Sequence, residues 1–131
     1  MSSNASATLT VAGWDENPYD EAEGTAKTTR ARITYTYEGA ITGEGTSESL
    51  MVYVGQEAEY VGLERITGTI EGKSGAFVVS VSGAFRDGVA RWNWEIVTGS
   101  ATGELEGLTG SGNAEAPMGN QATLTFDYDL G

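Results

Sequence analysis

Residues 77–96 read FVVSVSGAFRDGVARWNWEI and contain the clearest structural pattern in the chain. Apolar and polar residues alternate on both sides of Asp87-Gly88, a pair favoured in two-residue hairpin loops. Because successive side chains of a strand point to opposite faces, each run has one apolar face. We therefore predict a β-hairpin with both apolar faces toward one interior: Phe77, Val79, Val81 and Phe85 from the first strand, and Ala90, Trp92, Trp94 and Ile96 from the second.

The alternation continues away from this hairpin in both directions along the chain. Residues 31–37 and 124–128 alternate in the same way, and the 19 glycines separate runs rich in Val, Ile, Thr, Tyr and Phe. Helical periodicity is almost absent. These patterns predict eight strands, near residues 7–14, 29–38, 43–53, 59–71, 75–86, 89–98, 112–115 and 122–130.

Eight consecutive strands predict an all-β fold, a closed eight-stranded antiparallel barrel, because closure removes the edges that an open sheet exposes. A chain of 131 residues suits one domain, so we expect a single barrel over residues 1–131. The acidic, aperiodic segment 15–27 is expected to be a long loop, either a solvated connection or a lid over one barrel end. Leu105 and Leu108 are three residues apart, which suits a short helical turn that plugs a barrel end.

The composition excludes several classes of partner and chemistry. Seven basic residues against 19 acidic ones give a net charge of -12, which repels nucleic acids and anionic membranes, so we expect neither as a partner. The N-terminus lacks the pattern of a secretory signal and no run could span a membrane, so we expect a cytoplasmic protein. The chain has no Cys and no His, which excludes disulfides, thiolate nucleophiles, Ser-His-Asp sites and the common zinc sites. We therefore expect no cofactor and no metal.

Two opposite charges are adjacent in the strand-like run YVGLERI, residues 60–66. Whichever face of this strand is buried, either Glu64 or Arg65 faces the interior, and a buried charge needs a partner, a solvated cavity or a function. We expect Glu64 to face inward, because its face carries the larger apolar residues and two glycines that leave room for a ligand. By alternation Glu48 shares a face with Leu50 and is expected in the same interior.

Two carboxyl groups in one enclosed cavity repel each other and lose hydration, which suits one of them to proton transfer near neutral pH. Glu64 and Glu48 are therefore the candidate catalytic residues. The alternative is structural: either acid can pair with Arg65, Arg32 or Arg91 on the outer wall, and the aromatic residues can simply fill a core. The candidate ligand-binding residues are Tyr35, Tyr37, Leu50, Phe77, Trp92, Trp94 and Phe126.

Several segments of the chain, taken in their order and spacing, resemble those of a family of small bacterial proteins of unknown function. They are residues 14–19 (WDENPY), 43–46 (GEGT), 61–65 (VGLER), 67–69 (TGT), 75–77 (GAF) and 102–105 (TGEL). The resemblance covers nearly the whole chain and implies a barrel similar to that of allene oxide cyclase and plant dirigent proteins, often assembled as homo-oligomers. It implies no reaction. The family tends to have a small residue where this chain has Trp92, which predicts a narrower cavity or a stacking platform.

Three functions fit these observations. The first is a barrel that binds a small, largely apolar molecule in its interior or mouth, oriented by Glu64. The second is a cofactor-independent cyclase, isomerase or lyase that uses the carboxyl groups for acid-base catalysis. The third is a structural or interaction module whose outer residues Val61 and Leu63 pack against a partner subunit. A ligand-sized internal cavity would favour the first two.

Overall fold

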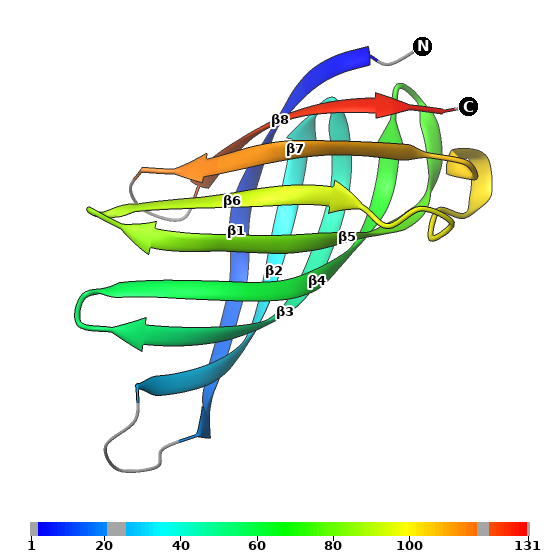
Figure 1. The fold of residues 1–131 in the computed structure, drawn as a ribbon. Helices are drawn as coiled ribbons and strands as arrows, with labels where there is room; N and C mark the ends of the chain where they lie inside the picture. Colours follow the sequence, from blue (N-terminus) through cyan, green and yellow to red (C-terminus); the bar gives the residue numbers. More distant parts are fainter. Residues whose placement is uncertain (1–2, 21–25, 118–120, 131) are drawn as a thin grey trace.

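The computed structural model describes residues 3–20, 26–117 and 121–130 and forms a closed barrel of eight antiparallel strands in sequence order (Figure 1). This confirms the predicted fold class; the likeness to allene oxide cyclase stays a prediction. The strands are β1 (Ser3–Asp20), β2 (Lys27–Gly39), β3 (Ile41–Val54), β4 (Glu57–Ile70), β5 (Lys73–Arg86), β6 (Val89–Ile96), β7 (Thr109–Ala116) and β8 (Gln121–Asp129). The predicted hairpin is confirmed, because β5 and β6 are joined by Asp87 and Gly88, both with positive φ.

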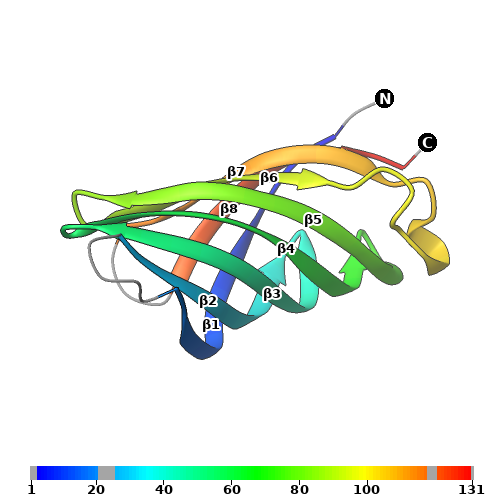
Figure 2. The same ribbon diagram turned by 60° about the horizontal axis from the view of Figure 1, so that its bottom comes forward.

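The first strand is longer than expected and closes the barrel. Its first half pairs with β8, from Ser3 opposite Tyr128 to Thr10 opposite Gln121, and the strand pairs with β2 from Ala7 to Asp20 (Figure 2). The expectation of a loop from residue 15 is therefore wrong for residues 15–20, which pair with β2. Bulges between Val11 and Gly13 and between Pro18 and Asp20 hide the alternation while the ladder continues. The rest of that expected loop, residues 21–25, lies outside the described residues.

One half of the interior is densely packed; we call it the packed half. It is sealed by the short 3₁₀ helix η1 (Gly103–Leu105), which lies at the end of the barrel away from the β5–β6 turn (Figure 1). Leu105 and Leu108 are fully buried there, which confirms the predicted plug. A Cβ on Gly75 would lie 2.0 Å from the carbonyl oxygen of Thr102, so a glycine allows the plug to approach β5 this closely. The side chains that fill this half include Phe77, Trp94, Phe126, Ile66, Ile70 and Leu124.

The other half of the interior is lined by small side chains together with aromatic ones and leaves a cavity unfilled; we call it the hollow half. Along β4 the inward residues change from Ile70 and Ile66 in the packed half to Gly62 and Ala58 toward the opposite end. Neighbouring strands contribute further small inward residues: Ser47, Ser49, Ala90, Ala116 and Ala122. The inward pattern of β4 thus sets a boundary at Glu64.

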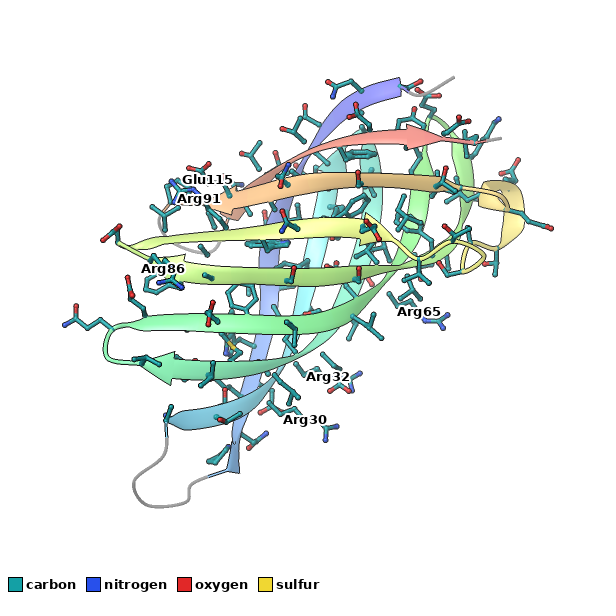
Figure 3. The ribbon with its side chains drawn as sticks, viewed as in Figure 1. Arg30, Arg32, Arg65, Arg86, Arg91 and Glu115 are labelled. Atoms are coloured by element: carbon teal, nitrogen blue, oxygen red, sulfur yellow. The ribbon has the colours of Figure 1, made fainter. Side chains whose placement is uncertain are left out.

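The outer face carries the arginines, which project away from the barrel (Figure 3). Arg30 pairs with Glu48 at 3.6 Å, Arg91 with Glu115 at 3.6 Å, and Arg86 with Glu57 at 3.2 Å. These pairs are solvent-exposed and contribute little to stability. Val61 and Leu63 are also exposed on this face; their contact with a partner subunit stays a prediction. Among the described residues, no helix has the length and apolar character needed to cross a bilayer.

Candidate functional site

The hollow half contains a cavity of about 330 Å³. Exposed residues of its lining, among them Trp14, Phe85 and Gln121, mark the mouth at the barrel end that carries the β5–β6 turn. Deeper in the barrel the lining is mostly apolar or aromatic, with a few polar groups. The deep lining comprises Tyr35, Ser47, Ser49, Tyr60, Glu64 and Trp92. This size and composition are typical of a small-molecule site.

Glu64 lies at the floor of the cavity, where the packed half begins, and is only 1% exposed. The hydroxyl of Tyr37 donates a hydrogen bond to its Oε2 atom at 2.5 Å. Gly45 on β3 faces the same carboxyl group, and a Cβ added to Gly45 would lie 2.1 Å from the Oε2 atom of Glu64. A side chain at residue 45 would therefore displace the carboxyl group from this position. The prediction that Glu64 faces the interior is confirmed; its role is still a prediction.

The electrostatics of the floor favour a carboxyl group that changes charge near neutral pH. Burial raises the pKa of Glu64 to about 7, and the hydrogen bond from Tyr37 opposes this rise. Burial, followed by the charge of Glu64, raises the pKa of Tyr37 and that of Tyr35. Burial also raises the pKa of Tyr60 to about 12. These tyrosines therefore keep their protons and act as hydrogen-bond donors.

The aromatic wall above Glu64 is held by contacts between strands. Tyr60 and Trp92 meet edge to face with ring centroids 6.4 Å apart, and the Tyr60 hydroxyl donates to the carbonyl oxygen of Arg91 at 3.3 Å. Gly83 lies between them on β5, opposite both Tyr60 and Trp92 in the ladder, so no side chain separates the rings. The prediction that Trp92 narrows the cavity or offers a ring agrees with its place in the lining.

A second carboxyl group, that of Glu16, lies beside the mouth. It accepts hydrogen bonds from the Thr29 hydroxyl at 2.6 Å, from the Trp14 indole at 3.0 Å and from the Tyr53 hydroxyl. Partial burial opposes ionisation, but these hydrogen bonds outweigh it and lower the pKa of Glu16. Glu16 thus ties together two rings of the mouth, Trp14 and Tyr53, and remains ionised.

The bulge in β1 is what places this cluster. Val11 faces inward opposite Tyr35, and one extra residue follows before Gly13 resumes pairing. Trp14 and Glu16 therefore lie opposite inward residues of β2, whereas regular alternation from Val11 would turn them outward. The sequence analysis missed this cluster. The available signal was the Trp-x-Glu spacing directly after a glycine.

Only some of the predicted ligand residues line the cavity. Tyr35 and Trp92 do, and Tyr37 lies beneath the floor, where it contacts Glu64. Placement in the cavity was wrong for four others. Phe77, Trp94 and Phe126 pack against one another in the packed half, and Leu50 is 41% exposed on the outer face. Alternation predicts which face is buried, but it does not predict how deep along the barrel a side chain lies.

The prediction that Glu48 shares the cavity is wrong. Glu48 is exposed on the outer wall, as the structural alternative predicted, but its partner is Arg30 and not one of the three arginines named there. Apolar residues occur at both the even-numbered and the odd-numbered positions of β3. Leu50 and Val52 indicated that the even-numbered positions face inward, but the inner face carries Met51 and Tyr53 at odd-numbered positions. The pairing of Ser47 with Glu64 fixes this register. The lining also includes residues that were not predicted to bind a ligand, among them Trp14, Ser47, Ser49, Met51 and Tyr53; Tyr60 was expected on the inward face with Glu64 but not as a ligand residue.

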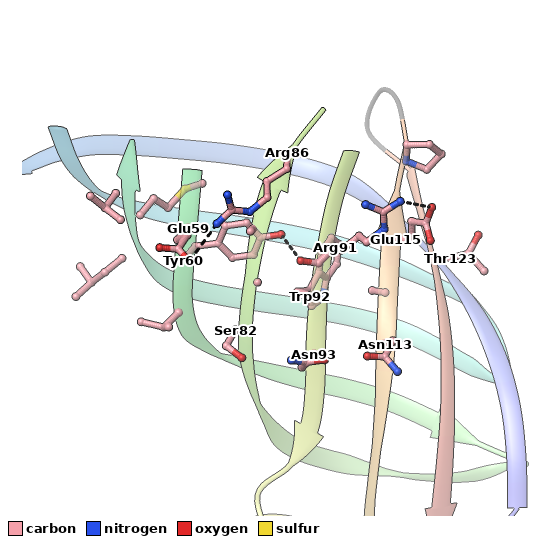
Figure 4. A pocket seen from close by; sticks show the side chains of 18 of the residues that line it. Glu59, Tyr60, Ser82, Arg86, Arg91, Trp92, Asn93, Asn113, Glu115 and Thr123 are labelled. Carbon is pink, nitrogen blue, oxygen red and sulfur yellow. Dashed lines mark hydrogen bonds and ion pairs between the residues drawn. The ribbon is translucent and has the colours of Figure 1, made fainter. Parts of the chain in front are cut away.

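A larger groove of about 1270 Å³ follows the outer face of the barrel from β2 to β8 (Figure 4). Its floor carries Ser82, Asn93 and Asn113, and its charged side chains, such as Arg91 and Glu115, are already paired. The carboxyl groups of its lining are exposed. Within the described residues, no group of three or more acidic side chains is arranged to hold a metal ion. The barrel cavity is therefore the better candidate site.

Comparison with known proteins agrees with the fold. A crystal structure of a protein with unknown function from the DUF3224 family of Shewanella oneidensis MR-1 is similar, with a TM-score of 0.83, 25% sequence identity and 98% of each chain covered. No curated protein matches the chain. The family model described as "Protein of unknown function (DUF3224)" matches residues 5–128. The chain therefore belongs to the DUF3224 family, as its resemblance to small bacterial proteins of unknown function predicted.

Proposed function

We propose that the chain binds a small, largely apolar molecule inside the barrel and that Glu64 orients it. The observation that carries this proposal is a cavity of about 330 Å³ with a buried carboxyl group at its floor. An apolar cavity of about 150 Å³ accepts benzene, so this one has room for a ligand of roughly a dozen non-hydrogen atoms. A protein with only a structural role would gain stability by filling such a space.

The polar groups of the lining support a bound, oriented ligand. Glu64, Ser47 and Tyr35 come from three neighbouring strands and converge at the floor, while apolar and aromatic side chains make up most of the wall. A few convergent polar groups in an apolar pocket fix the orientation of a ligand without a large desolvation cost. Ser49 is 7% exposed and lies one inward position nearer the mouth than Ser47, so its side chain borders the ligand volume.

The proposal is tested with a matched pair of variants that make the same chemical change inside and outside the barrel. A panel of small apolar molecules is screened by thermal shift and by intrinsic tryptophan fluorescence, to which Trp92 of the cavity wall contributes. Ser49→Leu places a larger side chain in the cavity and should abolish the response to every hit, whereas Ser82→Leu, on the outer face, should leave it intact. Hits that persist equally in both variants would locate binding elsewhere and overturn the proposal.

The second candidate is acid-base catalysis without a cofactor, and it is favoured by one observation. Glu64 has a pKa of about 7, so near neutral pH it can both accept and donate a proton. The Tyr37 hydroxyl would position that carboxyl group. If a bound molecule is converted, Glu64→Gln should abolish product formation measured by NMR while the fold is retained. If a bound molecule is recovered unchanged after long incubation, catalysis is overturned for that molecule and only the binding function remains.

A further inference from the structure

Within the described residues, the side chains that line the cavity can carry only negative charge near neutral pH. Among its described lining residues Glu64 is the one side chain that becomes charged near neutral pH, and no Lys or Arg is present. The described arginines of the ion pairs, Arg30, Arg86 and Arg91, lie on the outer face. An anionic ligand would therefore meet a buried carboxyl group with no cation to compensate it. That arrangement is costly in a low-dielectric interior.

The wall around this carboxyl group is aromatic. Tyr35, Tyr60 and Trp92 line the deep cavity, and Trp14 and Tyr53 line the mouth. Aromatic faces attract ammonium groups, and a carboxylate among several rings is the usual composition of a site for organic cations. One of these rings already has such a contact within the chain. The ammonium group of Lys27 lies 5.5 Å from the centroid of the Tyr53 ring.

Long-range charge acts in the same direction. The chain has a net charge of -12, and the Glu16 carboxylate stands beside the mouth, where its hydrogen bonds favour the ionised form. A potential of this sign concentrates cations near the entrance and repels anions. Basic groups at this end of the barrel, such as Lys27 and Arg86, are not part of the cavity lining: the charge of Lys27 acts on Glu16, and Arg86 is paired with Glu57 on the outer face.

A cation also resolves the unfavourable burial of Glu64. The carboxyl group has a hydrogen bond from neutral Tyr37 but no positively charged partner within the described part of the chain. An ammonium group at the floor would supply that partner and hold Glu64 in its ionised form. The apolar part of the ligand would then extend toward the mouth along Tyr60 and Trp92.

Building on the proposed binding function, we propose that the ligand is an organic cation, an ammonium group on an apolar body, with the ammonium group against Glu64 and the aromatic wall. This assigns the chemical class of the ligand.

The test compares three probes of nearly equal size that differ in charge: 3-phenylpropylamine, which is protonated, 3-phenylpropanol, which is neutral, and 3-phenylpropanoate, which is anionic. Binding is measured by calorimetry near neutral pH. We expect the amine to bind at least about tenfold more tightly than the alcohol, and the carboxylate not to bind. Glu64→Gln should remove the preference for the amine. Glu48→Gln makes the same change of charge on the outer face and should leave the preference unchanged.

A second measurement uses the unmodified protein and does not depend on the folding of a variant. The groups that face Glu64 are Tyr35 and Tyr37 on β2 and Tyr60 on β4, and their raised pKa values keep them neutral across this range. Affinity for the amine should therefore rise by about tenfold from about pH 6 to about pH 8 as Glu64 ionises, while affinity for the alcohol stays flat.

The outcomes separate the two proposals. If the alcohol or the carboxylate binds inside the barrel as tightly as the amine, the assignment to cations is overturned and the binding function stands. If none of the probes binds and the wider panel gives no hit that Ser49→Leu removes, both proposals fall.

Discussion

The two halves of the barrel share the same eight strands but differ in what the inward positions carry. In the packed half, large side chains such as Trp94 and Phe77 interlock and η1 seals the end. In the hollow half, many inward positions carry Gly, Ala or Ser between the aromatic residues, and the end is bordered by exposed residues. Dense packing and unfilled space are therefore separated along the barrel axis. The packed half stabilises the fold, so the hollow half can remain unfilled.

Glu64 lies where the two halves meet. Its Tyr37 partner belongs to the packed core, while its carboxyl group lines the cavity. A rigid neighbour holds the carboxyl group in one orientation, which is what a binding or catalytic group needs.

The comparison predicts its largest effect for the two neighbouring tryptophans of β6. Trp94→Ala should lower the free energy of unfolding by about 3–5 kcal/mol, because it leaves a cavity within dense packing. Trp92→Ala should cost roughly half as much, because one side of that ring already borders unfilled space. Urea denaturation of both variants measures the difference. Equal losses would show that the halves are packed alike.

Glu64, at the boundary between the two halves, should make the free energy of unfolding depend on pH, with an effect of intermediate size. The folded state raises the pKa of Glu64 from 4.5 to about 7, so it binds the proton more tightly than the unfolded chain does. The resulting stabilisation is fully present below about pH 4.5 and is lost as the pH rises through about 7, a total of about 3 kcal/mol. Glu64→Gln should remove this part of the pH dependence.

Urea denaturation at about pH 5 and about pH 8 checks that prediction. Glu48→Gln serves as the control, because Glu48 is exposed and should leave the pH dependence as in the wild type. A Glu64→Gln protein with the same pH dependence as the wild type would mean that its carboxyl group is hydrated in the folded state.

The smallest expected effect comes from adding the same two methyl groups in each half. Ala7 faces the packed half and Ala90 faces the cavity. Ala7→Val should cost about 1–3 kcal/mol through overpacking. Ala90→Val should change the free energy of unfolding by no more than about 0.5 kcal/mol, because its methyl groups enter free space. Thermal and urea denaturation compare the two variants, and a large loss for Ala90→Val would argue that the cavity is already occupied by side chains.

The sequence predicted the fold well because the hairpin of residues 77–96 alternates without interruption. It also predicted the orientation of Glu64, since Tyr60 and Ile66 share its phase and the opposite phase offers Arg65 and two threonines. Leu105 and Leu108 indicated the plug because apolar residues in a polar, glycine-rich segment have few other uses. The hairpin and the plug rested on local patterns with one physical solution, whereas the choice of Glu64 over Arg65 rested on the larger apolar residues that share the phase of Glu64.

The remainder of the site depended on information that a local pattern does not contain. On β3 both phases are partly apolar, and only the pairing of Ser47 with Glu64 decides between them, so Glu48 and Leu50 were misplaced. A two-residue period likewise contains no information on how far along the barrel axis a side chain lies. The sequence therefore could not show that Trp94 lies in the packed half and Trp92 at the cavity. The mouth was missed because the bulge after Val11 breaks the alternation at the point where its residues begin.

That bulge has a consequence for how such proteins diversify. Deleting Ala12 would restore a regular ladder in which Gly13, Trp14 and the residues after them keep their present partners on β2. Trp14 and Glu16 would still face inward at the entrance. The bulge therefore absorbs a one-residue change in the length of β1, so a codon can be gained or lost at this point in evolution without altering the chemistry of the opening.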